Sequence, residues 1–307
     1  MRYFIAIPTY NGGDVWEECA KNIRDYSPKN TPVYVIDSGS KDQTISVSEK
    51  YGFEHISIES VDFNHGGTRN LAIENNMENY DYVIFLTQDA IPEPGFIEHI
   101  LSAFNDPKVA CTYGRQLPHK NARKISQHAR YFNYSDKGYV SGLSDKKSKG
   151  IKTVFMSNSF SAYRIATFRE LGGFVSNTIL CEDMYYAAKA VLAGYKVAYI
   201  PDAVVRHSHN YSPLEEFKRY FDIGVFHADE PWIKKEFGSA EGEGLKFIHS
   251  ELKYLAKHGF YLIPIALINT VFKLLGYKLG GKYRSLPLVI IKKISMHQKY
   301  WQSYNNK

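Results

Sequence analysis

The 307-residue sequence has few cysteines: Cys19, Cys111 and Cys181 are far apart and odd in number. This spacing fits neither a disulfide framework nor a zinc site, and it predicts a protein of a reducing compartment. Residues 2–7 have the pattern of a strand, so we expect no signal peptide and a cytoplasmic location. The longest apolar stretch, Phe260–Leu275, contains polar residues and falls short of the roughly 20 apolar residues of a membrane span.

Acidic residues are missing from the end of the chain. Residues 252–307 contain ten Lys and Arg residues and no Asp or Glu, so the net charge of +6 comes entirely from this part. The asymmetry argues against a nucleic-acid-binding surface over the whole protein, and we expect no nucleic acid partner. It favours a local basic element that faces an anionic surface such as lipid headgroups.

The chain has no internal repeat, and short apolar runs alternate with helical patterns. This alternation predicts an α/β protein built from βα units with a mainly parallel sheet. The expected strands are residues 3–7, 33–36, 55–58, 83–86, 109–113 and 196–200. The expected helices are residues 14–26, 42–51, 66–77, 94–104 and 183–193, followed by helices from Pro213 to the end. Residues 119–150 are polar and Lys-rich, which predicts either a long mobile loop or a solvated linker.

Carboxylates occur where two of the expected strands end. Asp37 ends the second strand and Asp89 follows the fourth, and open α/β sheets bind ligands at the carboxyl ends of their strands. A carboxylate in the position of Asp37 can accept a hydrogen bond from a pyrimidine N–H or a ribose hydroxyl. The alternative is helix capping, for which Asp42 is better placed.

Paired glycines begin the helix expected after the third strand. Gly66 and Gly67 can expose backbone N–H groups to a phosphate, and Arg69 adds a cation in the first turn. A cation at a helix N-terminus is disfavoured by the helix dipole, so an anionic ligand would explain it. The alternative is a tight turn in which Arg69 forms a structural ion pair.

Two further sites carry groups suited to catalysis. Asp89 can bind Mg²⁺ or Mn²⁺, and a histidine after the last strand can assist it. His207 and His209 would point to opposite faces of an extended segment, so we expect only one of them at the metal. Glu182 and Asp183 begin a helix, where the dipole stabilises the anion that a general base must be. Simple helix capping is the alternative for this pair.

Several of these motifs stand in the order typical of one enzyme family. They are Pro8-Thr9-Tyr10-Asn11, Asp37-Ser38-Gly39-Ser40, His65-Gly66-Gly67-Thr68-Arg69-Asn70, Thr87-Gln88-Asp89-Ala90 and Glu182-Asp183. Over about residues 1–230 the chain resembles family 2 glycosyltransferases of the GT-A fold. It is most similar to the rhamnosyltransferases that build bacterial O-antigens, capsules and cell-wall polysaccharides.

The resemblance implies roles for individual residues. It makes Asp183 the catalytic base and Asp89 and His207 the ligands of Mg²⁺ or Mn²⁺, with His209 as the second candidate. Thr87 replaces the first Asp of the family's Asp-x-Asp metal motif. The later Gln-x-x-Arg-Trp motif is not intact, so Arg219 receives no acceptor role. The residues implied to bind the donor are Pro8, Thr9, Tyr10, Asn11, Asp37, Ser38, Gly66, Gly67, Arg69, Gln88 and Glu182.

The resemblance also implies a reaction, namely inverting transfer of L-rhamnose from dTDP-β-L-rhamnose to a saccharide, which can be polyprenyl-linked. Donors such as UDP-GlcNAc, UDP-galactose or UDP-glucose are the alternative within this class. A non-catalytic saccharide- or membrane-binding protein is the competitor from another class, and a nucleotidyltransferase a more distant one.

The chain is expected to divide into two regions. Residues 1–230 would form the GT-A catalytic domain, and residues 231–307 a helical basic C-terminal region. In the latter, Phe260, Leu267 and Leu274 recur at helical spacing beside lysines, which is typical of a helix lying in a membrane interface. This region would contact the inner face of the cell membrane, the acceptor, or a second copy of the chain in a homodimer.

Overall fold

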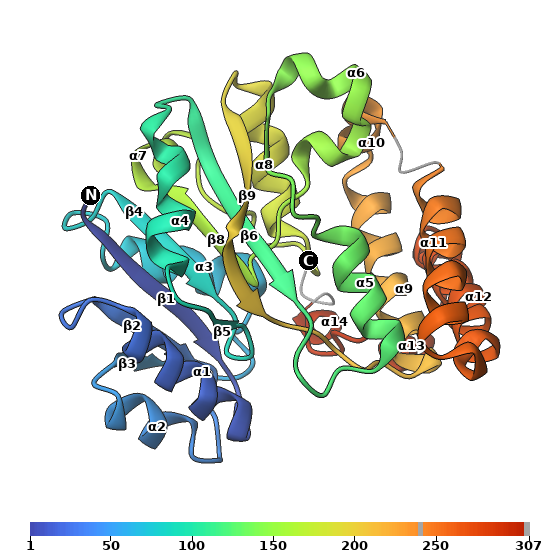
Figure 1. The fold of residues 1–307 in the computed structure, drawn as a ribbon, viewed down its shortest axis with the longest axis horizontal. Coiled ribbons are helices and arrows are strands. Elements are labelled where there is room, and N and C mark those ends of the chain that lie inside the picture. The colour runs from blue at the N-terminus through green and yellow to red at the C-terminus, as the bar shows by residue number, and fades with distance from the viewer. Residues whose placement is uncertain (239–241, 304–307) are drawn as a thin grey trace.

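The computed structural model describes residues 1–238 and 242–303, which form a β-sheet with helices on both faces and a block of C-terminal helices beside it (Figure 1). The strands are β1 Tyr3–Thr9, β2 Val33–Asp37, β3 Glu54–Ser57, β4 Tyr82–Leu86, β5 Ile91–Pro92, β6 Val109–Leu117, β7 Tyr139–Ser141, β8 Phe160–Arg164 and β9 Lys196–Arg206. The helices are α1 Gly13–Tyr26, α2 Thr44–Lys50, α3 His65–Glu74, α4 Phe96–Ser102, α5 Lys124–Asn133, α6 Lys146–Lys149, α7 Ile165–Glu170, α8 Glu182–Leu192, α9 Pro213–Asp229, α10 Pro231–Phe237, α11 Glu243–His258, α12 Ile263–Gly280, α13 Leu288–Ile294 and α14 Tyr300–Ser303.

The sheet has the strand order β3-β2-β1-β4-β8-β6-β9-β5, with β7 on the side of β9. The first four strands are parallel, as the βα pattern predicts. In the second half, β8 runs antiparallel to β4 and β6, and β5 and β7 run antiparallel to β9. The sheet is therefore mixed, and its parallel half carries the strand ends at which Asp37 and Asp89 lie.

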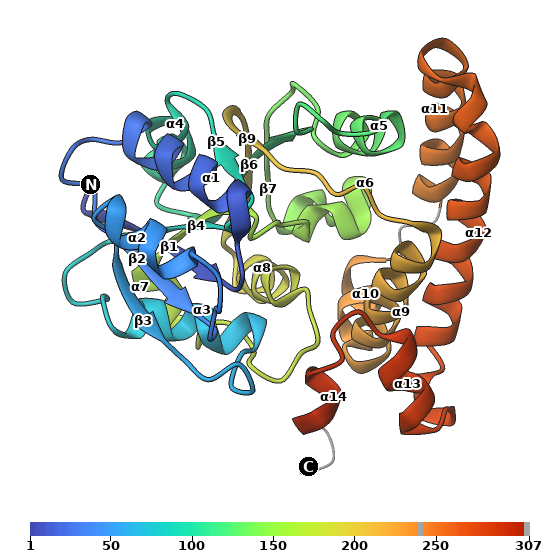
Figure 2. The same cartoon turned by 90° about the horizontal axis from the view of Figure 1, so that it is seen from below.

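The sheet separates two apolar cores because alternate side chains of a strand point to opposite faces. On β1, Phe4 and Ala6 enter the core with α3, α7 and α8, whereas Ile5 and Ile7 enter the core with α1, α2 and α4. Figure 2 shows these two layers of helices on either side of the strands. All four of these side chains are fully buried, which explains why the run is apolar without interruption.

Residues 119–150 are not the loop or linker that their polar composition predicted. They contain α5, β7, α6 and two 3₁₀ turns, Leu143–Asp145 and the start of Gly150–Val154. A few aromatic side chains hold the segment: Tyr134 is buried, the hydroxyl of Tyr139 lies 2.5 Å from that of Tyr113, and Tyr199 donates a hydrogen bond to the Ser135 carbonyl. The polar composition did not predict this regular structure, because the aromatic residues that stabilise it are widely spaced among lysines.

Two strands are longer than expected. β6 continues past Tyr113 to Leu117, and β9 continues past Ile200 to Arg206. They pair in parallel over this extension, where Gln116 lies opposite Val205. The extension carries Gln116 and His207 to the same end of the sheet.

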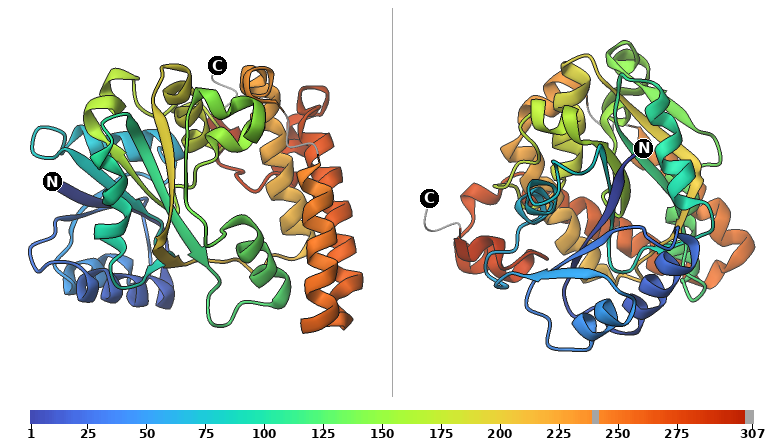
Figure 3. Two further views of the ribbon diagram at one scale, coloured as in Figure 1. Left: turned by 45° about the horizontal axis from the view of Figure 1, so that its top comes forward. Right: turned by 90° about the vertical axis from the view of Figure 1, so that its left-hand side faces the viewer.

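The backbones of α12 and α9 pack closely against each other. Figure 3 shows these two helices side by side with α11. Three glycines allow this approach. A Cβ atom on Gly276 or Gly280 would overlap the carbonyl oxygen of Phe217 or Phe221 of α9, and one on Gly224 would overlap the carbonyl of Tyr277.

The other side of α12 is apolar and open to solvent. Leu267, Ile268, Val271, Leu274 and Leu275 are between 46% and 53% exposed. Residues 260–280 form a helical stretch that is long and apolar enough to cross a membrane by length and composition, which the count to Leu275 did not indicate.

Candidate active site

A cavity of about 2190 Å³ lies at the carboxyl ends of β1, β4 and β9, between the sheet and the C-terminal helices. Ten of the residues predicted from the sequence line it, namely Pro8, Thr9, Tyr10, Ser38, Arg69, Gln88, Asp89, Glu182, Asp183 and His207. Asn11, Asp37, Gly66 and Gly67 are not among the lining residues. The cavity therefore gathers groups from distant parts of the chain.

Asp37 stabilises the loop beside the cavity, because both oxygens of its carboxylate accept hydrogen bonds from other residues of the protein. Oδ1 accepts hydrogen bonds from the hydroxyls of Thr9 and Ser40, and Oδ2 accepts from the backbone N–H groups of Gly39 and Ser40. Four bonds fill the lone-pair positions of a carboxylate. A direct bond from Asp37 to a nucleotide would have to replace one of them.

Tyr10 presents its ring to the cavity and is 46% exposed. The side-chain amide of Gln88 holds the Tyr10 backbone by accepting from its N–H and donating to its carbonyl, at 2.8 and 3.1 Å. Asn11 supports the same turn: its N–H donates to Ser40 and its side chain accepts from Lys41. Asn11 thus shapes the loop rather than the cavity surface.

The N–H group of Gly67 is bonded within the protein, which leaves the phosphate-binding interpretation without this donor. Asn64 caps α3 and accepts the Gly67 N–H at 2.5 Å, so this donor is already satisfied. A Cβ atom on Gly66 would overlap the carbonyl oxygen of Val175. The two glycines are needed for close packing at the start of α3 and for its cap.

Arg69 and Glu182 form a buried ion pair in which Nη1 lies 3.0 Å from Oε1, with each side chain 5% exposed. The side chain of Asn158 donates to the same carboxylate oxygen at 2.8 Å. Arg69 also donates to the carbonyl of His65. The ion-pair alternative is therefore the arrangement present, and the carboxylate of Glu182 is bonded within the protein directly before Asp183.

Asp183 projects into the cavity from the start of α8. Its carboxylate accepts hydrogen bonds from the backbone N–H groups of Asn158 and Met184, at 2.9 and 2.7 Å. Burial, and then the charge of Glu182, raise the pKa of Asp183 to about 7. A carboxyl with a pKa near neutrality is well matched to accepting a proton from a hydroxyl. The preceding Cys181 has a φ of 61°, a conformation that costs a non-glycine residue about 1–3 kcal/mol and is found at functional sites.

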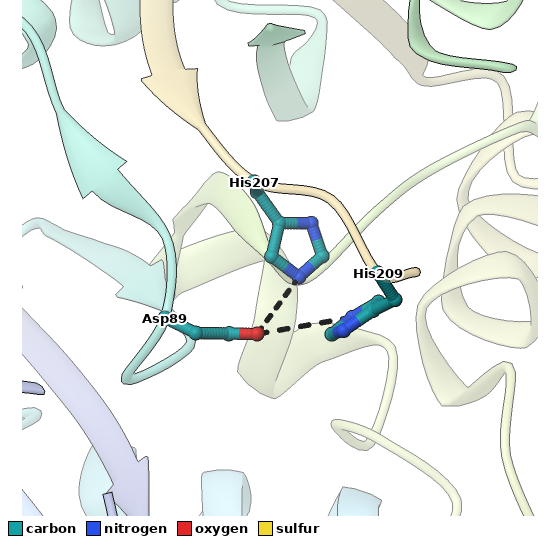
Figure 4. Close-up of side chains that lie close together, drawn as sticks. All are labelled: Asp89, His207 and His209. Carbon is teal, nitrogen blue, oxygen red and sulfur yellow. Dashed lines mark ion pairs between the residues drawn. The ribbon is translucent and has the colours of Figure 1, made fainter. Parts of the chain in front are cut away.

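A candidate metal centre consists of Asp89, His207 and His209 (Figure 4). Nε2 of His207 lies 3.4 Å and Nε2 of His209 lies 3.8 Å from Oδ2 of Asp89. Burial alone would raise the pKa of Asp89, but the adjacent His207 and His209 hold it well below its ordinary range. The three ligand atoms are close enough to bind one divalent cation.

Both histidines face Asp89, so the expectation that only one would do so is wrong. It assumed that the strand continues, but β9 ends at Arg206, so the alternation of faces along a strand does not extend to His207 and His209. His207 is oriented by Gln116, whose Oε1 lies 2.8 Å from Nδ1. Because an amide oxygen can only accept, Nδ1 carries the proton and Nε2 keeps its lone pair for a metal.

Some residues of the site were not predicted. Gln116 and Asn158 are buried; Gln116 contacts His207, and Asn158 donates to Glu182 and Asp183. Each has at least one polar neighbour in the sequence, so nothing there marked it as buried. Arg219 exposes its side chain to the cavity although its motif is incomplete. The segment Met296–Tyr300 also lines the cavity, and nothing in the sequence placed it there.

Comparison with known proteins is consistent with this geometry. The sequence model described as Glycosyl transferase family 2 matches residues 4–172. The chain is 51% identical over 305 residues to the O-antigen chain rhamnosyltransferase RfbN of Salmonella typhimurium, covering 99% of this chain and 97% of that protein. It is 48% identical over 303 residues to WbaN of Salmonella anatum, also an O-antigen chain rhamnosyltransferase, covering 98% and 96%.

Solved structures show the same fold at low sequence identity. A mannosyltransferase from Pyrobaculum calidifontis, in complex with GDP-Man and Mn²⁺, matches with a TM-score of 0.57 at 18% identity, covering 100% of this chain and 86% of that one. TarS of S. aureus, residues 1–349, matches with a TM-score of 0.53 at 17% identity, covering 92% and 91%. The GT-A fold and the resemblance inferred from the motifs are thereby confirmed, and the chain belongs to glycosyl transferase family 2.

Proposed function

We propose that this glycosyltransferase moves L-rhamnose from dTDP-β-L-rhamnose to a saccharide hydroxyl in the synthesis of a bacterial cell-surface polysaccharide such as an O-antigen. The observation that carries the proposal is the near full-length similarity to two O-antigen rhamnosyltransferases. The geometry supports the reaction class, because a base and a metal centre face the same cavity.

Asp183 is the proposed base. Its raised pKa lets it take the proton of the acceptor hydroxyl as the oxygen attacks the anomeric carbon from the side opposite the diphosphate. This in-line attack inverts the configuration of the transferred sugar. Asn158 and Met184 hold the carboxylate in place through their N–H groups.

Asp89, His207 and His209 would hold the divalent cation, which neutralises charge on the departing dTDP when it is bound. Two imidazoles beside one carboxylate favour Mn²⁺ over Mg²⁺, because Mg²⁺ is bound mainly by oxygen ligands. Gln116 keeps His207 in the ligating tautomer.

The nucleotide would lie at the ends of β1 and β2. Tyr10 offers an exposed ring for stacking, and Thr9 and Ser38 line the cavity beside it. Asp37 organises this loop, and Arg69 acts through Glu182 rather than by a direct bond.

The experiment is a donor panel with purified protein, Mn²⁺ and a rhamnose-accepting oligosaccharide. Hydrolysis and transfer are measured for dTDP-rhamnose, UDP-GlcNAc, UDP-galactose and UDP-glucose. We expect turnover with dTDP-rhamnose alone, and Asp183→Asn should lose about 10²–10⁴-fold in kcat while still binding dTDP. Turnover of a UDP-sugar instead would overturn the donor assignment. Nucleotide binding with no turnover on any donor would favour a non-catalytic binding protein.

We also propose that the acceptor is polyprenyl-linked and that the exposed side of α12 rests on the cytoplasmic membrane surface. Exposed leucines, an isoleucine and a valine lie in a basic region without acidic residues, the combination that binds an anionic interface. Sedimentation with phosphatidylglycerol vesicles tests this, and Val271→Asp with Leu275→Asp should abolish it. Vesicle-independent dimerisation through the same side, detected by light scattering and lost in this variant, would show instead that it is a homodimer contact.

A further inference from the structure

The C-terminal segment returns across the molecule to the end of β1, and we infer that it completes the nucleotide-binding wall of the cavity, with Lys299 contacting the pyrimidine base of the donor. Nζ of Lys299 lies 4.5 Å from the centre of the Tyr10 ring and donates a hydrogen bond to the hydroxyl of Ser60. The inference rests on the proposed nucleotide-sugar donor.

The segment is held at both ends by buried residues. Ser295 and Trp301 are fully buried, and Met296–Tyr300 between them line the cavity. The backbone N–H groups of Met296 and His297 donate to Oδ2 of Asp222, a fully buried carboxylate of α9, at 2.9 and 3.1 Å. The path of the chain is therefore fixed by the core of the C-terminal helices.

The middle of the segment Met296–Tyr300 packs against the start of α3, which lines the cavity on the side of Arg69. The ring of His297 lies 4.8 Å from that of His65, the first residue of α3, in an edge-to-face arrangement. Burial lowers the pKa of both imidazoles to about 3, so neither adds charge. The hydroxyl of Tyr300 donates to the carbonyl of Asn177 at 3.2 Å. Lys299 is thus the cation that this segment brings to the site.

The position of Lys299 fits recognition of a base. Tyr10 is still 46% exposed with Lys299 beside it, so its ring remains accessible to a stacking ligand. An ammonium group has three donors, of which Ser60 uses one. A thymine or uracil presents carbonyl oxygens as acceptors at its edge. Lys299 can therefore donate to the edge of a base that lies beside it against the exposed part of the Tyr10 ring, whereas the phosphates would lie toward Asp89.

The test measures the affinity of dTDP by titration calorimetry for the full chain and for Lys299→Met, which keeps the aliphatic stem and removes the charge. Hydrogen bonds to charged groups predict a loss of roughly ten- to hundred-fold in Kd. Lys299→Arg should recover part of it. Lys293→Met is the matched control, because Lys293 is an exposed lysine of α13 outside the cavity, and it should bind as the wild type does.

Two further readouts separate base recognition from a general effect of charge or folding. Inorganic pyrophosphate with Mn²⁺ should bind equally to the wild type and to Lys299→Met. In a Tyr10→Leu background, Lys299→Met should cause a smaller loss than alone, because the two contacts act on one base. An equal loss for pyrophosphate would overturn the assignment to the base.

The outcomes distinguish this inference from the proposed function. If wild-type protein binds dTDP and Lys299→Met binds it within two-fold, the inference is wrong and the proposed function stands. If UDP binds and dTDP does not, the donor assignment falls, and the same comparison with UDP decides the role of Lys299. If no nucleoside diphosphate binds, both are overturned.

Discussion

The guanidinium of Arg69 and the carboxylate of Glu182 form an ion pair that is closed to solvent, and the next residue of the chain is the proposed base. Removing one partner leaves the other charge buried, which typically costs about 3–5 kcal/mol. We therefore predict that Arg69→Met lowers the free energy of unfolding by about this amount, measured by urea denaturation.

Arg169 offers the matched control for this substitution. It pairs with Glu78 at 3.8 Å, and both side chains are more than half exposed. Arg169→Met should change stability little, since exposed pairs contribute little. Equal losses for the two variants would contradict the structural role given to the Arg69–Glu182 pair.

The activity should depend on pH through Asp183. Its pKa is raised to about 7, and only the deprotonated carboxylate can accept a proton. We expect kcat to rise with pH through about 7, to level off above it, and to be lost as the pH falls. Glu182→Gln removes a negative neighbour that raises this pKa, so the acid limb should move to lower pH.

The control for the pH profile is Glu78→Gln, an exposed acid outside the cavity, which should leave the limb in place. Glutamine at position 182 can still accept from Arg69 and Asn158 but leaves the Arg69 charge unpaired, so the variant should fold with reduced stability. A limb that does not move in Glu182→Gln would show that another group governs it.

Metal affinity should depend on Gln116, although this residue would not touch the ion. Gln116→Leu removes the acceptor that fixes Nδ1 of His207, and loss of such a partner typically weakens binding by about 10–100-fold. Paramagnetic resonance of free Mn²⁺, without nucleotide, measures this directly. Gln116→Glu should restore affinity because a carboxylate also accepts the Nδ1 proton.

Ser157→Ala serves as the comparison for Gln116, since Ser157 accepts from Nε2 of Gln116, whereas His207 is bonded to Oε1. It should leave Mn²⁺ affinity near that of the wild type. His207→Ala and His209→Ala should each weaken Mn²⁺ binding. Retention of full affinity in His209→Ala would remove His209 from the metal centre.

The crossing of α12 and α9 should not tolerate a methyl group. Gly280→Ala places its Cβ against the backbone carbonyl of Phe221, and forced overpacking costs about 1–3 kcal/mol. Gly244→Ala in α11 meets open space and should be neutral or stabilising, since alanine is the better helix former. Thermal melting of the two variants checks this, and equal melting temperatures would contradict it.

The parallel half of the sheet was predictable because β1, β2 and β4 are buried on both faces and read as apolar runs. The positions of Asp89 and Asp183 followed from strand and helix ends. The close packing of Gly66 could not be foreseen, since it depends on Val175 and α3 meeting in space. The cap by Asn64 is local to the start of α3, but the paired glycines beside it were interpreted as a phosphate site instead. The contact between Lys299 and Tyr10 could not be predicted either, because the two residues lie near opposite ends of the chain and meet only in the folded protein.

The glycine contacts between α12 and α9 have a consequence for the reach of the enzyme. Because Gly276 and Gly280 rest on backbone atoms of α9, α12 cannot roll about its axis without losing that contact. Asp222 of α9 binds the backbone of Met296 and His297, which line the cavity, so α9 joins α12 to the cavity wall. On a bilayer this linkage would set a constant height for Asp183 above the lipid surface. If α12 rests on a membrane as proposed, a lipid-linked acceptor would have to span the distance from that surface to Asp183.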